Sequence, residues 1–406
     1  MLRISSLSIL VNLALVSVLS TLVGAQTRKP RALYDSGATD QEIKIGNIAP
    51  YTGAFKEYGA VAKAEAAYFK MINDRGGING RKINFLTRDS GSDDTTALAP
   101  AQELVEREQV LLLFAPFGTE ANLAIRAYLN EHKIPQLFVQ SSSTVFNDPA
   151  HFPWTMGFYE TYRVEGLAYA KYVAESRRDA KIAILYPDDE IGKEYLAGVH
   201  DGLGSRTSMI VKEVPYRTSD RDLGSQIDEL KASGADVFLN FSVGRFATLA
   251  IRRTYDLGWH PLQFIPNASL SVAAFLDPAG LQKAAGVITS ARSKGWQRPD
   301  AGSDPAVRAF LDWMEKYNPD ASLRDQNNVA GYERAEALVE VLKRCGDNLT
   351  RANVMKQASN LDLDLGMLHD GIRVKTSPTD YQPIKQLFLI KFNGKAWVPF
   401  GAVIGG

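Results

Sequence analysis

The chain has 406 residues, of which 45% are hydrophobic and 23% charged. This length allows two domains of ordinary size, and the composition supports packed cores and argues against disorder. Lys and Arg together number 46, as do Asp and Glu, so the formal net charge is zero and a nucleic-acid-binding protein is disfavoured. With Cys345 as the single cysteine, an intrachain disulfide is excluded.

The first 25 residues predict a secretory signal peptide. Arg3 supplies a basic start, residues 7–22 are apolar, and Val23-Gly24-Ala25 fits a small-residue cleavage site. We expect cleavage after Ala25 and a mature protein that is periplasmic and soluble. An uncleaved membrane anchor is the alternative, and the shortness of the apolar segment disfavours it. Residues 26–41 are polar and lack periodicity, which predicts a flexible leader.

Strand-like and helix-like segments then alternate along the chain. In the first half the predicted strands are residues 43–48, 82–87, 110–115 and 135–139, and the predicted helices are residues 60–73, 96–108 and 120–132. The continuous apolar run at 110–115 is typical of a buried parallel strand. Gly76 and Gly77 follow a helix, so they predict a helix stop and not a dinucleotide-binding loop.

The same alternation continues in the second half. Its predicted strands are residues 181–186, 209–214, 236–241, 263–266, 286–290 and 386–392, the last followed by a hairpin turn at Asn393-Gly394. Its predicted helices are residues 165–176, 192–203, 223–232, 246–256, 304–317 and 328–344. Strands that alternate with helices of 10–15 residues predict parallel α/β sheets, and the number of strands indicates two such domains.

The sequence carries no recognisable catalytic or metal-binding motif. The five histidines are scattered, and no zinc motif, nucleophile elbow or phosphate-binding loop is present. We therefore predict no catalytic residue, no metal and no cofactor.

Three loops that follow predicted strands carry small hydroxyl residues. They contain Gly118 and Thr119 in the first loop, Ser142, Ser143 and Thr144 in the second, and Ser242 in the third. Hydroxyls and free backbone N–H groups at strand ends and helix starts suit a carboxylate ligand. Helix capping is the alternative for each loop, but the feature on two consecutive loops of one sheet favours a ligand site.

Aromatic residues gather in the connecting stretches of the chain. Phe158, Tyr159 and Tyr162 lie in the apparent crossover between the halves, whereas Tyr58 precedes the first long helix and Tyr332 lies in a late one. Aromatic walls with a few polar groups describe a small-molecule cleft, and core packing is the alternative for each ring.

At these residues the chain resembles periplasmic solute-binding proteins of the leucine/isoleucine/valine-binding type, which serve ABC importers. The resemblance covers nearly the whole mature chain and is carried by IGNIAPYTGAFKEYG, MINDRGGINGRK, NNVAGYERAEALVE and the loops around Thr119 and Ser142. It implies two parallel-sheet α/β lobes joined by three crossovers, with a ligand cleft between them that closes about a hinge. The expected lobes are residues 42–159 plus 290–365 and residues 160–289 plus 366–406.

The resemblance also implies a binding site. Thr119 and the loop from Ser142 to Thr144 would hold a ligand carboxylate, and Tyr58 and Tyr332 would line the cleft. Where amino-acid binders of this type place acidic groups for the ligand ammonium, this sequence has Tyr162 and Ala268, and an aromatic position is occupied by Ile191. A buried ammonium without a carboxylate partner is costly, so an amine-free acid, such as a benzoate or hydroxycinnamate, is favoured.

We therefore expect a monomeric, non-enzymatic receptor that delivers a small carboxylate to ABC permease subunits. Three alternatives stay open. The ligand is instead a hydrophobic amino acid if Glu160 or Glu165 reaches the cleft near Tyr162 or Ala268. A sensory binding module is a second alternative, and a secreted α/β enzyme is a third that the absence of a nucleophile–base pair disfavours.

Overall fold

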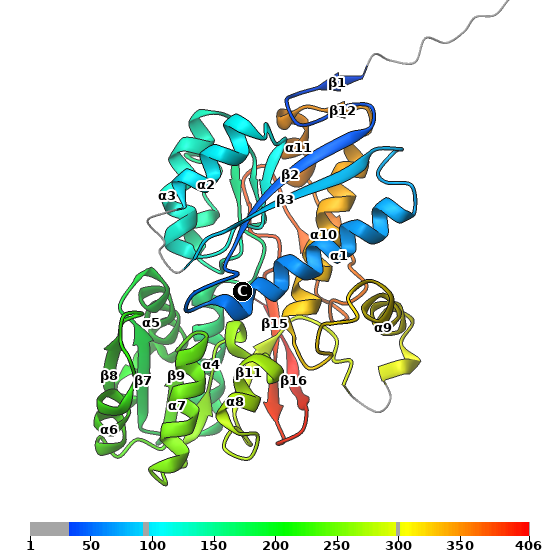
Figure 1. Ribbon diagram of the computed structural model, residues 1–406. Helices are drawn as coiled ribbons and strands as arrows, with labels where there is room; N and C mark the ends of the chain where they lie inside the picture. Colours follow the sequence, from blue (N-terminus) through cyan, green and yellow to red (C-terminus); the bar gives the residue numbers. More distant parts are fainter. Residues whose placement is uncertain (1–31, 92–96, 298–300, 406) are drawn as a thin grey trace, which may run out of the picture. The chain divides into compact units, whose positions relative to one another are not determined.

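The computed structural model of the protein describes residues 32–91, 97–297 and 301–405 (Figure 1). Residues Leu33–Gly406 form one compact unit. The predicted signal peptide, its cleavage site at Ala25 and residues 26–31 of the predicted leader lie outside the described residues. Within the described part of the chain, no helix is both long and apolar enough to cross a membrane.

A first sheet contains five parallel strands in the order β3-β2-β4-β5-β6. The strands are β2 (Glu42–Ala49), β3 (Lys82–Asp89), β4 (Leu112–Phe114), β5 (Gln136–Leu137) and β6 (Thr155–Met156). In β2, Ile45 pairs with Phe85 on one side and with Leu112 on the other. This interior position explains why the strand is buried from Ile45 to Ala49, as expected for a parallel strand covered on both faces.

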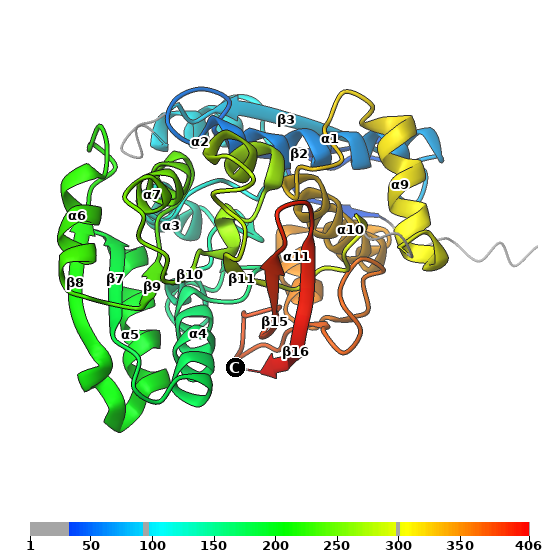
Figure 2. The same cartoon turned by 90° about the horizontal axis from the view of Figure 1, so that it is seen from below.

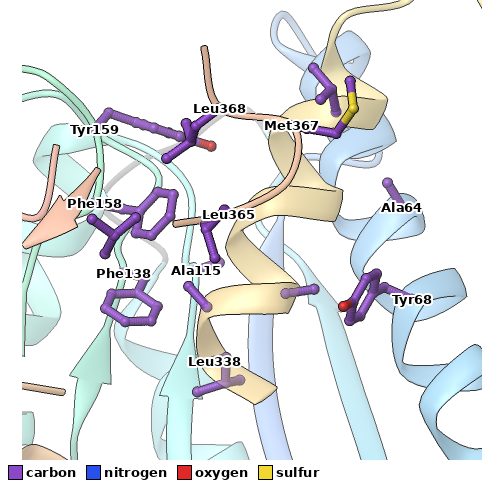
Figure 3. Close-up of a cluster of buried hydrophobic side chains, with 14 of the residues drawn as sticks. Ala64, Tyr68, Ala115, Phe138, Phe158, Tyr159, Leu338, Leu365, Met367 and Leu368 are labelled. Carbon is purple, nitrogen blue, oxygen red and sulfur yellow. The ribbon is translucent and has the colours of Figure 1, made fainter. Parts of the chain in front are cut away.

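Helices from distant parts of the sequence complete this first lobe. They are α1 (Gly59–Asp74), α2 (Leu98–Gln102), α3 (Thr119–Glu131), α9 (Pro305–Tyr317), α10 (Asn327–Cys345) and α11 (Arg351–Ala358). In Figure 3, Ala64 and Tyr68 of α1 and Leu338 of α10 lie in one apolar cluster with Phe138. A side chain at Gly331 of α10 would meet the carbonyl oxygen of Val61 at 2.5 Å, so glycine permits the close approach of α1 and α10.

A second sheet has the order β16-β15-β11-β10-β9-β7-β8. Its strands are β7 (Ile182–Pro187), β8 (Ile210–Tyr216), β9 (Val237–Asn240), β10 (Leu262–Phe264), β11 (Ile288–Ala291), β15 (Gln386–Phe392) and β16 (Trp397–Gly405). The last two form an antiparallel hairpin beside β11, drawn in red in Figures 1 and 2. The helices of this second lobe are α4 (Tyr162–Ser176), α5 (Glu190–Leu203), α6 (Gly224–Ala232), α7 (Arg245–Asp256) and α8 (Asp277–Ala279).

The predicted architecture of two parallel-sheet α/β lobes is confirmed. The chain passes between the sheets three times, at residues 157–161 after β6, from residue 292 on after β11, and at residues 376–385 before β15. Sequence periodicity missed α11 and the shortest strands, among them β13 (Asp362–Leu363) and β14 (Val374–Lys375). Strands of two residues are too short to show an alternating pattern.

The structure departs from the predicted segment boundaries in two places. Residues Leu33 and Tyr34, predicted to belong to a flexible leader, form β1 and pair in parallel with β12 (Asn348–Leu349). The segment 366–385, predicted to lie in the second lobe, instead packs on the first: Leu368 shares the cluster of Phe158 (Figure 3), and Ile384 donates a backbone hydrogen bond to Phe158. Both contacts join residues far apart in sequence, so local patterns could not reveal them.

Candidate ligand-binding cleft

A cavity of about 210 Å³ lies between residues of the two lobes. A cavity of this size is far larger than the space of one water molecule, so it suits a small organic molecule. Many of the residues that line the cavity lie at strand ends and helix starts, where α/β proteins bind ligands. The lining includes Tyr58, Phe117, Gly118, Thr119, Ser141, Ser142, Tyr159, Tyr162, Ile191, Asn267, Ala268, Arg292 and Trp296.

The hydroxyl wall of the cavity is built where α3 begins. Gly118 precedes this helix with φ of 93°, a conformation that glycine adopts without strain. The Thr119 and Ser141 hydroxyl oxygens lie 2.7 Å apart, and both side chains are buried. The N-terminus of α3 carries free backbone N–H groups and a positive partial charge, which favour an anion. This wall therefore offers neutral donors for a carboxylate.

Aromatic rings form much of the remaining surface. Tyr58 stacks on Phe117 with ring centroids 5.4 Å apart. Its hydroxyl donates to the carbonyl of Ala268 at 3.0 Å and accepts from the backbone N–H of Gly244 at 3.1 Å, so Tyr58 joins the two lobes. Tyr162 packs on Tyr195 at 5.1 Å, and burial raises the pKa of Tyr162 to about 12, which keeps its hydroxyl protonated.

Seven of the eleven residues predicted for the site line the cavity. They come from both lobes and are Tyr58, Gly118, Thr119, Ser142, Tyr162, Ile191 and Ala268. The structure thus brings these residues together, and their contact with a ligand stays a prediction.

Ser143 and Thr144, also predicted for the site, are not among the residues that line the cavity and instead hold a carboxylate of the protein itself. The Ser143 hydroxyl donates to Glu194 of α5 at 2.5 Å. The backbone N–H of Thr144 donates to both oxygens of Glu194, at 2.8 and 3.0 Å, and its hydroxyl donates at 3.0 Å. The inference that this loop suits a carboxylate was chemically sound, but its partner is internal.

Ser242 and Tyr332, also predicted for the site, are likewise not among the residues that line the cavity. Ser242 is buried and donates its hydroxyl to Asn240 at 2.5 Å, which stabilises its own loop. Tyr332 lies between Phe310 and Trp313, with ring centroids 5.4 and 4.9 Å away, so it is a packing residue of the first lobe. For both, the structural alternative noted from sequence is the one that the fold adopts.

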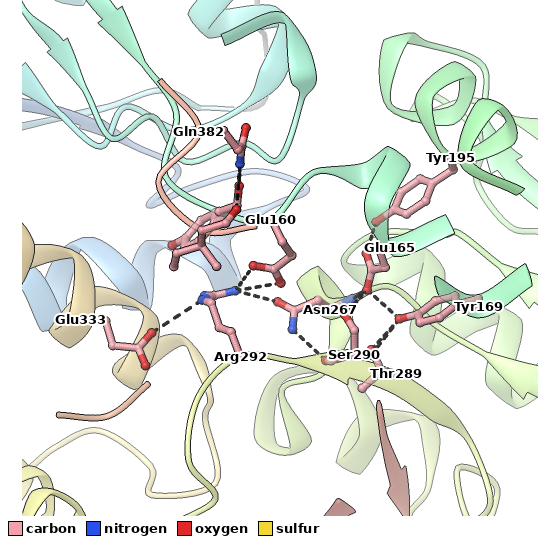
Figure 4. Close-up of polar contacts among 12 residues, drawn as sticks. Glu160, Glu165, Tyr169, Tyr195, Asn267, Thr289, Ser290, Arg292, Glu333 and Gln382 are labelled. Atoms are coloured by element: carbon pink, nitrogen blue, oxygen red, sulfur yellow. Dashed lines mark hydrogen bonds and ion pairs between the residues drawn. The ribbon is translucent and has the colours of Figure 1, made fainter. Parts of the chain in front are cut away.

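The main residue that sequence reasoning missed is Arg292, directly after β11. Its side chain is only 7% exposed and lines the cavity. Nη1 lies 3.3 Å from both oxygens of Glu160 and donates to Asn267 at 3.2 Å (Figure 4). The signal available in the sequence was a charged residue at the end of a buried strand, but such residues are common at strand ends.

Glu160 and Glu165, the two acids named from the sequence as possible partners of a ligand ammonium, are already engaged. Glu165 is buried and accepts hydrogen bonds from the hydroxyls of Tyr169, Tyr195 and Ser290 and from the backbone N–H of Asn267, each at 2.6 Å (Figure 4). Burial raises the pKa of Glu165. Glu160 faces Arg292, and neither acid is among the residues that line the cavity.

Within the described ranges, no group of three or more His, Cys, Asp or Glu side chains is placed to hold a metal ion. Cys345 is buried, as predicted, and burial raises the pKa of its thiol to about 12. The arrangement of the cleft therefore suits binding by hydrogen bonds and aromatic contact.

Comparison with known proteins places the chain in a family. Residues 42–396 match the model of the periplasmic binding protein family, and the chain belongs to that family. It is a binding protein and not an enzyme. Over 345 aligned residues the chain is 24% identical to Leu/Ile/Val-binding protein homolog 1 of Brucella abortus. The alignment covers 82% of this chain and 87% of that protein.

Solved structures show the same fold. A branched-chain amino acid ABC transporter protein from Thermus thermophilus with bound valine is similar with a TM-score of 0.79 and 17% identity, covering 91% of this chain and 98% of that one. A solute-binding protein of an ABC transporter from R. palustris in complex with 4-hydroxybenzoate is similar with a TM-score of 0.76 and 18% identity, covering 90% and 97%. The predicted type I periplasmic binding protein fold is thereby confirmed.

Proposed function

We propose that the protein is the extracytoplasmic solute-binding receptor of an ABC importer, which captures a small carboxylate between its lobes and delivers it to the permease. An aromatic or other amine-free organic acid is the favoured ligand. The protein acts outside the cytoplasm after cleavage behind Ala25, and it works as a monomer. Membership of the periplasmic binding protein family supports the receptor role.

The observation that carries the ligand class is the chemistry of the cavity wall. The hydroxyls of Thr119, Ser141 and Ser142 line the cavity, and the N-terminus of α3 at Thr119 lies beside them. Such donors bind a carboxylate without a full opposing charge, so the ligand can still be released to a transporter. The rings of Tyr58, Phe117 and Tyr159 offer flat apolar surface beside those donors.

The preference for an amine-free ligand rests on the two buried acids near the cleft. Glu165 already accepts four hydrogen bonds, and Glu160 already faces Arg292. An ammonium held by Glu160 or Glu165 would have to break one of these arrangements, which is costly. The acids that line the cavity itself are Glu120 and Asp189, and Asp189 already accepts a hydrogen bond from the backbone N–H of Gly192 at 3.2 Å, where it caps α5. The relative that binds 4-hydroxybenzoate shows that this fold can hold such an acid.

A hydrophobic amino acid is the second candidate. The names of the Brucella relatives and the valine in the Thermus thermophilus structure favour it. In that case the ligand ammonium would have to be held by hydroxyl and carbonyl oxygens of the wall.

Isothermal titration calorimetry distinguishes the two candidates. The protein is unfolded and refolded to remove bound ligand and is then titrated in parallel with 4-hydroxybenzoate, p-coumarate and leucine. We expect one-to-one binding of an aromatic acid and no heat from leucine. Tight leucine binding with silent aromatic acids would overturn the proposed ligand class while leaving the receptor role in place.

A further inference from the structure

One buried charge at the cavity has no role in carboxylate capture by the α3 wall. Arg292 lines the cavity with its side chain 7% exposed. Its guanidinium stacks over the ring of Tyr159, with Cζ 4.2 Å from the ring centroid. The stacking and the flanking acids fix the guanidinium in one orientation, which is the condition for selective recognition.

The hydrogen-bonding capacity of this guanidinium is only partly used by the protein. All its hydrogen bonds leave from Nη1, to Glu160 and Asn267. Nε is buried beside Glu333, 3.6 Å from its carboxylate oxygen, whereas Nη2 donates to no described residue and is not among the buried unpaired atoms. A guanidinium has five N–H donors, and buried donors are nearly always satisfied in native proteins. An acceptor is therefore missing at a cationic group that faces the cavity.

Asn267 is fixed so that it cannot supply that acceptor. Its amide nitrogen donates to the carbonyl of Ser290 at 2.8 Å, its side-chain oxygen accepts from Arg292, and its backbone N–H donates to Glu165. Asn267 and Trp296 line the cavity together with Arg292. The protein thus holds a rigid polar corner, separate in sequence and in fold from the Thr119–Ser142 wall.

We propose that Arg292 recognises a second acceptor group on the ligand, such as a phenolic hydroxyl or a second carboxylate. The ligand is then an organic acid with two polar ends joined by a flat or apolar body, with one carboxylate at the Thr119 wall and the other polar group at Arg292. This inference rests on the proposed function, because it assumes that the α3 wall holds a carboxylate. It makes Arg292 a specificity-determining residue.

A purely structural role would explain Arg292 less well. A guanidinium needed only to neutralise Glu160 and Glu333 could lie wholly within the protein, as the Glu65–Arg334 pair does with both side chains 0% exposed. Arg292 instead lines the cavity, whereas Arg334, which also has one unpaired nitrogen, does not. A site built to hydrogen-bond a substrate group discriminates strongly against an analogue that lacks it, because its own polar atoms are then left unpaired.

The test compares ligands that differ only at the second end. The refolded wild-type protein is titrated by calorimetry with benzoate, 4-hydroxybenzoate and terephthalate. We expect 4-hydroxybenzoate or terephthalate to bind at least about tenfold more tightly than benzoate, the effect of one hydrogen bond to a charged group. The double variant R292M/E160Q, which removes both charges of the pair, should bind all three acids with similar affinity while keeping its affinity for benzoate.

The matched control is R334M/E65Q, which removes an equally buried pair that does not line the cavity. It should keep the wild-type ratio of affinities. Equal binding of the three acids by the wild type, or an unchanged ratio in R292M/E160Q, would overturn the role of Arg292 and leave carboxylate capture intact. Uniform loss of all three ligands in R292M/E160Q would also overturn it. Silence of all three acids with tight binding of leucine would instead refute the proposed ligand class, and this inference with it.

Discussion

Buried charged side chains gather beside the cleft. Glu65 of α1 and Arg334 of α10 are each 0% exposed and approach to 2.6 Å, and Arg334 also lies 5.3 Å from the ring of Tyr159. Arg292, which is paired with Glu160, lies 4.2 Å from the centroid of the same ring. Removing charges from water is expensive, so each of these groups depends on its partner.

The dependence of Glu65 on Arg334 can be tested by breaking the pair. The variant R334M leaves a buried carboxylate without its cation, and we expect it to lower the free energy of unfolding by about 3–5 kcal/mol. The double variant R334M/E65Q removes both charges and should recover most of that loss. Urea unfolding followed by circular dichroism measures both values; equal stabilities of the single and double variants would contradict the pairing argument.

Glu336 of α10 predicts how stability depends on pH. Burial raises its pKa from 4.5 to about 7, with repulsion from Glu333 adding to the effect. Between pH 4.5 and 7 the folded protein therefore keeps a proton on Glu336 that the unfolded chain releases. This contribution to stability is fully present below pH 4.5 and is lost as the pH rises through 7.

The variant E336Q cannot release that proton. We expect it to equal the wild type in stability near pH 4.5 and to exceed it at pH 8 by on the order of 2 kcal/mol. Thermal unfolding across this pH range measures the difference. A constant difference between the two proteins at every pH would show that Glu336 does not titrate in the folded state.

At the scale of elements, the packing of α4 against α5 positions much of the cleft. These helices carry Tyr162, Glu165 and Glu194. They approach closely because glycine lies at their contact: a side chain at Gly198 would meet the carbonyl oxygen of Arg163 at 2.1 Å, and one at Gly202 would meet that of Leu167 at 2.6 Å. Helices can come this near only where a small residue leaves room.

The variant G198A places a methyl group in that contact. We expect the helices to separate and the free energy of unfolding to fall by about 1–3 kcal/mol. G302A is the control, because a side chain there would meet no atom within 4 Å, and its effect should stay within about 0.5 kcal/mol. Chemical unfolding of both variants measures this; an unaffected G198A would mean that α4 and α5 adjust without cost.

At the scale of the whole molecule, hydrogen bonds join the two lobes at three places. Glu194 of the second lobe accepts from Ser143 and Thr144, and the Ser271 hydroxyl donates to Asp325 at 2.8 Å. The Tyr58 hydroxyl bonds to Ala268 and Gly244 of the second lobe. Hydrogen bonds between the lobes stabilise the closed conformation, in which the lobes are in contact. They therefore raise the fraction of molecules that are in the conformation able to bind a ligand.

The variant E194A should shift the protein away from that arrangement. We expect a larger radius of gyration in small-angle X-ray scattering without ligand, and a Kd for 4-hydroxybenzoate about tenfold higher, because hydrogen bonds to a charged group are lost. The control is D201N on the same helix, which removes only the exposed bridge between Asp201 and Arg163. Scattering curves of E194A and wild type that superimpose would contradict a role for Glu194 in holding the lobes together.

The sequence alone predicted much of the fold and part of the site. Each long strand and helix carried its own periodic pattern, so β2, α1, β7 and α10 were placed within a few residues. The hydroxyls of Thr119 and Ser142 were found because strand ends mark the ligand edge of an α/β sheet. The sequence could not show that Tyr332 packs against Phe310 and Trp313, because an aromatic residue in a helix has the same local pattern whether its ring faces a cleft or a core.

What the sequence by itself determined was the alternation of elements, the two lobes and the polar character of the loops, since these follow from local patterns of burial and turn residues. Only the tertiary structure decided which polar group meets which. In the folded protein, the loop at Ser143 and Thr144 donates hydrogen bonds to Glu194, which lies 50 residues from Thr144 in the sequence. Arg292 donates to Glu160, which lies 132 residues away. Long-range partners depend on how the lobes pack, and packing is a property of the whole chain.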